Sequence, residues 1–286
     1  MAGTLYVVAT PIGNLEDITL RALRILRDAQ LIAAEDTRRT ARLLSRYDIH
    51  APTTSLHEHN EAAKLTRILE RLASGDHVAL VSDAGTPTIS DPGRRLIRAA
   101  LDAGIRVEPI PGPSAILAAV AASGLDATSF LFLGFPPTRS KDRMAWFDAL
   151  KQAGRPAVFF EAPHRIRRTL EEMLAQLGDI RIVAGRELTK AHEELVVGPI
   201  SVALERLTLP RGEFTIVAEI GRTPEHGLPQ GTSLGRSAVA NRQMLGLTTD
   251  LLPVSRRADI KAFARRHGLA ANQVYDLIEA ARKSGE

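Results

Sequence analysis

The chain has 286 residues, of which 44% are hydrophobic, 24% charged and only 4% aromatic, a composition typical of a globular protein long enough for two domains and a small appendage. The absence of cysteine excludes disulfides and cysteine-ligated zinc, and the scarcity of aromatic residues argues against a nucleic-acid site built mainly on ring stacking. The net charge of +4 is mild, and the sequence has neither a signal-peptide pattern nor an apolar stretch long enough to span a bilayer, so we expect a cytoplasmic protein.

The first part of the chain alternates strand and helix patterns. Apolar runs predict strands at 5–9, 31–34, 78–81 and 107–110. Helical spacing predicts helices at 18–29, 37–47, 60–74, 92–103 and 114–122, the last of them capped by Ser114. This alternation predicts a mostly parallel sheet covered on both faces, in an α/β domain over residues 1–122.

The pattern restarts after Gly124 and then changes. Strands are predicted at 130–133, 157–160, 180–184, 194–197 and 214–220, with helices at 140–152 and 165–177. The later strands follow one another closely, which is typical of an antiparallel or mixed sheet. We therefore expect a second α/β domain over residues 123–222.

The last part of the chain differs in composition. Residues 223–250 are rich in Gly, Pro, Thr and Ser and are predicted to be a linker. Residues 251–286 predict two short helices joined near Gly268, a pattern that resembles a helix-turn-helix domain. This segment has seven Lys or Arg against four Asp or Glu, which favours a polyanionic partner. A solvated tail, or a helical hairpin packed on the body or on a dimer mate, explains it equally well.

Five loops rich in Gly, Pro and acidic residues follow predicted strands. They are TPIGNLEDIT from Thr10, AEDTR from Ala34, SDAGTPTISDPG from Ser82, PGPSA from Pro111 and EAPHR from Glu161. In open α/β sheets, ligands bind outside the carboxyl ends of the strands. Five such loops predict one shared crevice, and hence an enzyme.

The small residues of these loops point to a ligand that contacts the backbone. Gly13 permits positive φ and close approach of a ligand, and Pro11 removes a backbone donor. The run from Ser82 to Gly93 exposes backbone groups that suit an amino acid or a nucleoside. It matches neither the phosphate loop of ATP-binding proteins nor the dinucleotide turn, so ATP and NAD are disfavoured.

The polar residues at the strand ends have both functional and structural explanations. Glu35 and Asp36 could act as acid and base, or Asp36 could cap a helix and pair with Arg38. Asp17 could be catalytic or merely favourable beside a helix N-terminus. The stretch RELTKAHEE from Arg186 could belong to the site or form a solvated hairpin tip. The histidines lack the spacing of metal ligands.

Together, the five loops and the RELTKAHEE stretch closely resemble the tetrapyrrole methylase superfamily, and within it the branch of 16S ribosomal RNA cytidine 2′-O-methyltransferases. The match runs from about Gly3 to Gly221. The resemblance implies a two-domain α/β methylase, S-adenosylmethionine as the methyl donor, a homodimer, and 16S rRNA or the small ribosomal subunit as the substrate. No metal is implied.

The resemblance also implies roles for individual residues. Those expected to bind the cofactor are Pro11, Gly13, Asp83, Gly85, Thr86, Ile89, Ser114, Ala115, Ala162 and Pro163. Those expected to face the RNA are Asn14, Asp17, Arg38, His164, Arg165 and Lys190.

The implied reaction is attack of a ribose 2′-oxygen on the sulfonium methyl group, helped by alignment and by a base. Candidates for the base are Asp17, Glu35, Asp36, Glu161 and Lys190, where Lys190 requires a pKa lowered toward neutrality. Two rival functions stay open: methylation of a small porphyrinoid, and a non-catalytic ribosome-binding protein.

Overall fold

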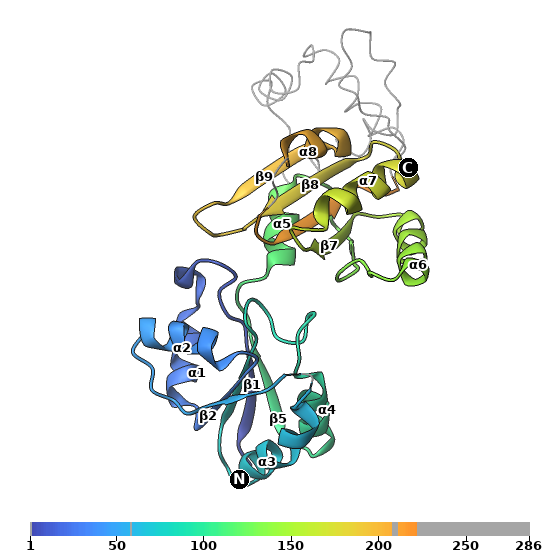
Figure 1. Ribbon diagram of the computed structural model, residues 1–286. Helices are drawn as coiled ribbons and strands as arrows, with labels where there is room; N and C mark the ends of the chain where they lie inside the picture. The colour runs from blue at the N-terminus through green and yellow to red at the C-terminus, as the bar shows by residue number, and fades with distance from the viewer. Residues whose placement is uncertain (1, 58, 208–210, 222–286) are drawn as a thin grey trace, which may run out of the picture. The chain divides into compact units, whose positions relative to one another are not determined.

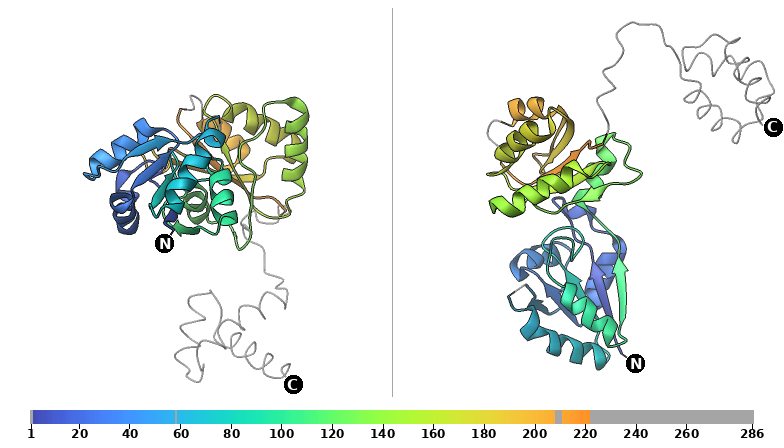
Figure 2. Two further views of the ribbon diagram at one scale, coloured as in Figure 1. Left: turned by 90° about the horizontal axis from the view of Figure 1, so that it is seen from below. Right: turned by 90° about the vertical axis from the view of Figure 1, so that its right-hand side faces the viewer.

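In the computed structural model of the chain, residues 2–57, 59–207 and 211–221 are described, and they contain two five-stranded sheets (Figure 1). The predicted linker and helix pair at 223–250 and 251–286 lie outside the described residues. Figure 2 shows the elements of the first sheet, in blue to green, and those of the second, in yellow-green to orange, as two separate groups. None of the helices in the described ranges is both long and apolar enough to cross a membrane.

The first sheet is parallel throughout, as the alternation of strands and helices predicts. Its strand order is β3-β2-β4-β1-β5. The bounds are β1 (Thr4–Val8), β2 (Leu31–Ala34), β3 (Thr53–Ser55), β4 (Val78–Val81) and β5 (Arg106–Ile110). All five strands therefore end at the same edge, and the loops that follow them meet there.

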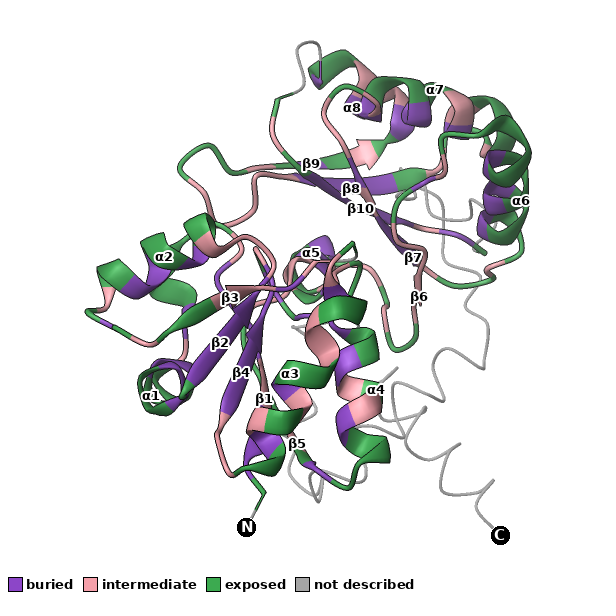
Figure 3. Ribbon diagram, turned by 60° about the horizontal axis from the view of Figure 1, so that its bottom comes forward, coloured by how far each residue is buried: buried purple, intermediate pink, exposed green. Residues whose placement is uncertain are grey.

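Helices cover both faces of this sheet, and its inner strands β2 and β4 are buried (Figure 3). Two lie on one face, α1 (Leu20–Asp28) and α2 (Thr37–Arg46), and two on the other, α3 (Glu61–Ala73) and α4 (Arg94–Asp102). Along β4, Val78 and Leu80 pack against α3 and α4, whereas Ala79 and Val81 pack against α1 and α2. Burial on both faces explains why these strands are continuous apolar runs.

Helix α4 begins at Arg94, two residues later than its sequence pattern predicts. Gly93 adopts a φ of 109°, outside the helical region, and provides no side chain to cap the helix. The cap comes from α3 instead, because the buried carboxylate of Glu61 accepts a hydrogen bond from the Leu96 N–H at 3.0 Å.

Removing this cap should destabilise the fold. Glu61→Ala leaves the Leu96 N–H buried without an acceptor, which costs about 1–2 kcal/mol in the free energy of unfolding. Glu61→Gln keeps a carbonyl oxygen for the same bond and should lose less than about 1 kcal/mol. Urea unfolding of both variants measures the difference, and equal losses would show that the bond to Leu96 contributes little.

The second sheet is mixed, as the crowded strands of the sequence predict. Its order is β6-β7-β10-β8-β9, in which β6 and β7 are parallel and the other neighbours antiparallel. The bounds are β6 (Leu131–Phe132), β7 (Ala157–Glu161), β8 (Arg181–Arg186), β9 (Glu194–Pro199) and β10 (Phe214–Ala218). The α/β class with one parallel and one mixed sheet is thereby confirmed.

Helices also cover both faces of the second sheet. On one face lie α6 (Ser140–Lys151), α7 (Ile166–Leu177) and α8 (Ile200–Arg206), packed on residues such as Phe159 and Ile216. On the other lies α5 (Ala115–Ser123), whose Ile116 and Ala119 pack with buried valines of β7, β8 and β10. The predicted domain boundary after residue 122 stays a prediction, and α5, which precedes it, packs on the second sheet.

Three short elements have no counterpart among the predicted ones: β3, α8 and the 3₁₀ turn Leu15–Asp17. The three residues of β3 are exposed or half-buried, so they lack the apolar signal of the inner strands. Helix α8 has seven residues and begins directly after Pro199, the last residue of β9, so its helical pattern is short.

Candidate functional site

A cavity of about 410 Å³ lies where loops from both sheets meet. Seven of the ten residues predicted to bind a cofactor line it: Gly85, Thr86, Ile89, Ser114, Ala115, Ala162 and Pro163. They come from the loops after β4, β5 and β7. Ser114 also caps α5, because its Oγ accepts from the Leu117 N–H at 3.4 Å. The structure thus gathers residues far apart in the sequence around one space, and their cofactor contacts stay a prediction.

The loop after β4 is held against the loop after β1 by a short antiparallel bridge. Thr10 and Gly85 exchange two backbone hydrogen bonds, each 2.9 Å long. Further along this loop, Thr88 and Ser90 adopt φ values of 72° and 69°. Residues other than glycine rarely adopt this conformation, and such strain concentrates at ligand sites. Ile89, between them, faces the cavity.

The remaining three predicted cofactor residues, Pro11, Gly13 and Asp83, are absent from the cavity lining. Gly13 does not use a positive φ; instead the loop after β8 lies against it. A Cβ on Gly13 would lie 2.4 Å from Lys190 Cγ and 2.8 Å from the Leu188 carbonyl oxygen. The neighbouring Asn14 N–H donates to Thr189 Oγ1 at 3.1 Å. The close approach that glycine permits here is that of the protein chain.

Three carboxylates gather at the ends of β2 and β4. Asp83 accepts from the Asp36 N–H at 2.9 Å and pairs with Arg39 at 3.4 Å. Burial raises the pKa of Glu35, opposed by a 3.3 Å hydrogen bond from the Asp83 N–H. Asp91, which lines the cavity, has its pKa raised to about 7 by burial and by the charges of Glu35 and Asp83. Asp91 therefore changes protonation near neutral pH.

The other carboxylates considered as a base are either engaged in bonds within the protein or lie outside the cavity lining. Asp36 caps α2 and pairs with Arg38 at 2.8 Å, and these bonds lower the pKa of Asp36 to about 2. Asp17 is exposed and does not line the cavity. Glu161 is buried at the cavity wall, where it accepts from Thr169 Oγ1 at 2.6 Å and pairs with Arg165 at 3.3 Å. Its oxygens are thus already engaged.

Lys190 lines the cavity, but its pKa moves in the direction opposite to the one that a catalytic base requires. Burial lowers the pKa of Lys190, but hydrogen bonds to Glu187 at 2.7 Å and Glu213 at 3.1 Å outweigh burial and raise it overall. Lys190 is therefore an ammonium that holds two cavity-lining carboxylates. The lowered pKa that Lys190 would require to act as a base is therefore not found, because these two carboxylates stabilise its charge.

The residues expected to face RNA are placed differently from one another. Arg38 and His164 are exposed. Arg165 turns inward, where it bonds to Glu161 and to the Pro136 carbonyl oxygen. Asn14 lies at the contact with Thr189.

Sequence reasoning assigned no role to several residues that line the cavity, among them Asp91, Phe135, Phe160 and Glu213. The Phe135 and Phe160 rings lie 5.4 Å apart. Phe135 follows β6 in a Gly-Phe-Pro-Pro segment. A turn of this kind directly after a predicted strand could have indicated that Phe135 belongs to the site. No sequence pattern indicated Glu213, which precedes β10, because its role depends on its contact with Lys190.

The cavity combines apolar walls with a few charged groups. Ile12, Ile89 and Leu188 provide apolar surface, while Asp91 and the pair of Glu187 and Lys190 provide charge. Such a lining suits an organic ligand with polar ends. Within the described residues, no group of three or more His, Asp or Glu side chains could hold a metal ion.

Comparisons with known proteins agree on one family. The family model of Tetrapyrrole (Corrin/Porphyrin) Methylases matches residues 4–203. A protein of Escherichia coli O157:H7 named Ribosomal RNA small subunit methyltransferase I is 41% identical over 278 residues, covering 96% of this chain and 93% of the relative. A protein of Mesorhizobium japonicum with the same name is 43% identical and covers 99% of this chain and 94% of its own length.

Solved structures share the fold at low identity. A diphthine synthase superposes with a TM-score of 0.62 at 18% identity, covering 76% of this chain and 90% of that one. A uroporphyrin-III C-methyl transferase of Thermus thermophilus, complexed with S-adenyl homocysteine, gives a TM-score of 0.55 at 17% identity, covering 75% and 97%. The chain belongs to the tetrapyrrole methylase family and, within it, to the group of ribosomal RNA small subunit methyltransferase I.

Proposed function

We propose that the protein is an S-adenosylmethionine-dependent methyltransferase that methylates the 2′-oxygen of a cytidine ribose in 16S rRNA of the small ribosomal subunit. The observation that carries this proposal is a cavity lined by the strand-end loops in a chain 41% and 43% identical to relatives named for rRNA methylation.

The cavity fits the proposed cofactor in size and chemistry. Its volume of about 410 Å³ lies in the range of organic-ligand sites, roughly 300–1,000 Å³. Thr86, Ala115 and Ala162 would hold it through loop backbone, and Ile89 through apolar contact. The Thermus thermophilus protein, which has the same fold, was solved in complex with S-adenyl homocysteine, and this supports the assignment. When bound, S-adenosylmethionine supplies a methyl carbon activated by a positively charged sulfur.

The chain's own residues then align the substrate and take its proton. A ribose hydroxyl is a weak nucleophile, and a base with a pKa near the working pH assists it most. Among the carboxylates of the cavity, Asp91 is the one whose pKa is raised to about 7. We assign Asp91 as the acceptor of the 2′-hydroxyl proton at a carboxylate oxygen. Glu35 and Asp83 keep it basic through their charges, and Lys190 holds Glu187 and Glu213 in place.

The test is transfer of radiolabel from S-adenosylmethionine to 30S subunits and to naked 16S rRNA, both from a strain without this modification. Label on a single cytidine 2′-oxygen is the expected result, and the better substrate identifies the state of the RNA. Cofactor binding without label in either RNA would overturn the RNA assignment and favour a porphyrinoid substrate. A protein that binds RNA but no cofactor would support the non-catalytic alternative.

We also propose that the protein acts as a homodimer. Helix α5 is apolar on its outer side as well, where Leu117 is 58% exposed. The exposed Leu195 and Val197 of the edge strand β9 pair with Gly185 and Val183, and Val183 packs in the cluster under α5. They therefore lie on the same face as α5. An exposed apolar face of this kind is typical of a protein interface. Analytical ultracentrifugation of wild type and Leu117→Glu tests it.

A further inference from the structure

We infer that helices α1 and α2 form the surface on which the phosphate backbone of the RNA lies. This inference rests on the proposed function and adds the docking surface that it lacks. Residues 20–46 contain seven arginines and three acidic residues, a net charge of +4 that equals that of the whole chain. This one segment, which contains α1 and α2, therefore has the same net positive charge as the whole chain.

All seven arginines point to solvent on two neighbouring helices. Every one of them is exposed: Arg21, Arg24, Arg27, Arg38, Arg39, Arg42 and Arg46. The helices share one apolar cluster, in which Leu23 and Leu26 of α1 pack with Leu43 and Leu44 of α2. Arg27 also donates to the Tyr47 carbonyl oxygen at 3.3 Å, which ties α1 to the end of α2. The arginines of these two neighbouring helices (Figure 1) are therefore treated as one surface, here called the arginine face.

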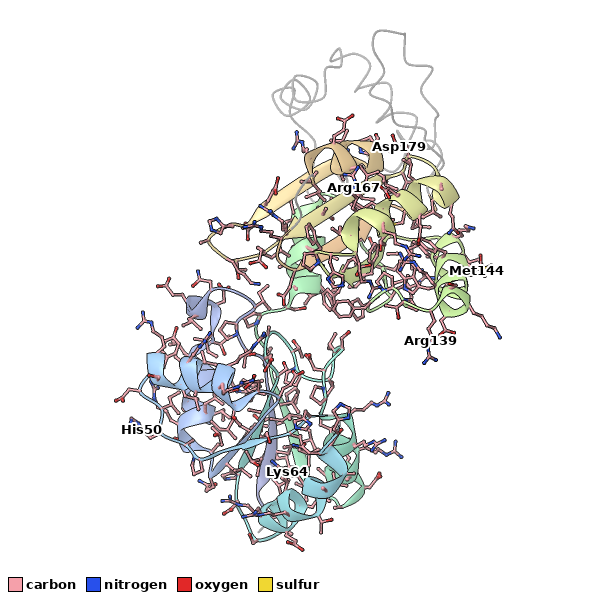
Figure 4. All side chains as sticks on the ribbon, in the orientation of Figure 1. His50, Lys64, Arg139, Met144, Arg167 and Asp179 are labelled. Carbon is pink, nitrogen blue, oxygen red and sulfur yellow. The ribbon has the colours of Figure 1, made fainter. Side chains whose placement is uncertain are left out.

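On α2, the arginine face lacks the acidic residue four positions on that pairs with arginines of other helices. Arg167 on α7 (Figure 4) pairs with Glu171 at 3.1 Å, and Arg98 on α4 pairs with Asp102 at 3.1 Å, each four residues on. On α2, the positions four residues apart are Arg38, Arg42 and Arg46. Like charges at this spacing destabilise a helix by roughly 0.2–0.5 kcal/mol per pair. Conversely, an RNA backbone laid along the row removes this repulsion.

Four of the seven guanidinium groups are available to a ligand. Arg21 pairs with Glu108, Arg38 with Asp36 and Arg39 with Asp83. Within the described residues, Arg24, Arg27, Arg42 and Arg46 have no acidic partner. A guanidinium fork binds two phosphate oxygens at once and is weakly hydrated, so a row of unpaired guanidinium groups suits a phosphate backbone. The Arg46 guanidinium carbon lies 5.7 Å from the centre of the Tyr47 ring.

The arginine face leads to the candidate site. One end of the face is the N-terminus of α2, where Arg39 pairs with Asp83 at 3.4 Å. The charge of Asp83 in turn raises the pKa of Asp91 in the cavity wall. From Arg38 to Arg46 the helix rises about 12 Å. RNA held along α2 thus has its backbone anchored next to the loop where its target nucleotide must enter.

The test measures binding of the full chain to transcribed 16S rRNA as a function of salt. The variant is Arg24→Gln/Arg42→Gln/Arg46→Gln, and the matched control is Arg67→Gln/Arg95→Gln/Arg206→Gln, three exposed arginines of α3, α4 and α8 without an acidic partner in the described residues. Each lost phosphate contact should reduce the slope of log K against log salt by about 0.7–0.9. We expect a slope smaller by about 2 and binding weaker by at least ~10-fold, with the control close to wild type.

Two further readouts separate this inference from the proposed function. S-adenosylmethionine affinity and the rate at saturating RNA should stay near wild type in both triple variants, because neither set touches the cavity. An unchanged slope in the α1–α2 variant, or an equal loss in the control, would overturn the arginine face. The two ideas can also fail separately. If the wild-type protein transfers no methyl group to RNA, but the salt slope of RNA binding is smaller only in the α1–α2 variant, the proposed function is overturned and the arginine face is supported.

Discussion

Asp91→Asn is expected to slow single-turnover methyl transfer by about 10²- to 10⁴-fold, the usual contribution of a general base. The amide has nearly the same size as the carboxylic acid but cannot accept a proton. Although Asp91 lines the cavity, the amide keeps the size of the side chain, so the same variant should still bind S-adenosylmethionine with an affinity within about tenfold of wild type. Rapid-quench measurement of the first turnover, with cofactor binding by calorimetry, separates the two effects.

The pH dependence provides a second readout of the same residue. Since burial, Glu35 and Asp83 raise the pKa of Asp91 to about 7, the wild-type rate should rise with pH and level off above about pH 7. Stability should follow the opposite course. The raised pKa contributes stability that is complete below about pH 4 and is lost as the pH rises through about 7. The melting temperature of Asp91→Asn should therefore be higher than that of wild type at pH 8 and equal to it at pH 4.

Asp17→Asn is the matched control for this prediction. Asp17 is also a carboxylate near a strand end, but it is exposed and outside the cavity. Its replacement should leave rate and pH profile unchanged. A large loss in Asp17→Asn, or a full rate in Asp91→Asn, would place the proton acceptor elsewhere.

The sequence predicts the location of the site better than its chemistry. Gly85 and Ser114 could be assigned to one crevice because they follow β4 and β5, whose ends share an edge of the parallel sheet. Pro163 follows β7 of the second sheet, and its assignment to the same crevice came from the family resemblance. The pKa of Asp91 could not be foreseen, since it depends on Glu35 and Asp83, which are brought beside it only when β2 and β4 pair. The charge state of Lys190 could not be foreseen for the same reason, because Glu213 contacts it from the residue before a different strand.

The two roles of glycine show a similar limit. A glycine in a strand-end loop indicates either an unusual φ or a close approach, and the sequence does not distinguish them. Gly85 has a positive φ of 79°, whereas Gly13 accommodates the loop at 188–190. Thr189, which bonds to Asn14 beside Gly13, lies 175 residues further along the chain than Asn14, and no local pattern contains that distance.

Gly13→Ala should therefore weaken cofactor binding although Gly13 does not line the cavity. The new Cβ would lie 2.4 Å from Lys190 Cγ and 2.7 Å from Thr189 Oγ1, so the loop at 188–190 must move away. Leu188 and Lys190 form part of the cavity wall, and their displacement opens it. Overpacking of this kind costs about 1–3 kcal/mol. If the displaced loop must return to its place when S-adenosylmethionine binds, this cost lowers the affinity measured by calorimetry by roughly 5- to 150-fold.

Gly104→Ala separates this effect from a general loss of stability. Gly104 has a φ of 68°, and a methyl group added to it would meet no atom within 4 Å, so alanine strains the backbone there by about 1–2 kcal/mol without touching a neighbour. The control should lower the melting temperature and keep cofactor affinity, whereas Gly13→Ala should lose affinity. If Gly13→Ala binds the cofactor as tightly as wild type, the loop at 188–190 yields without altering the cavity. Lys190 then lies beside the site without shaping it, and the contact between the two loops serves stability alone.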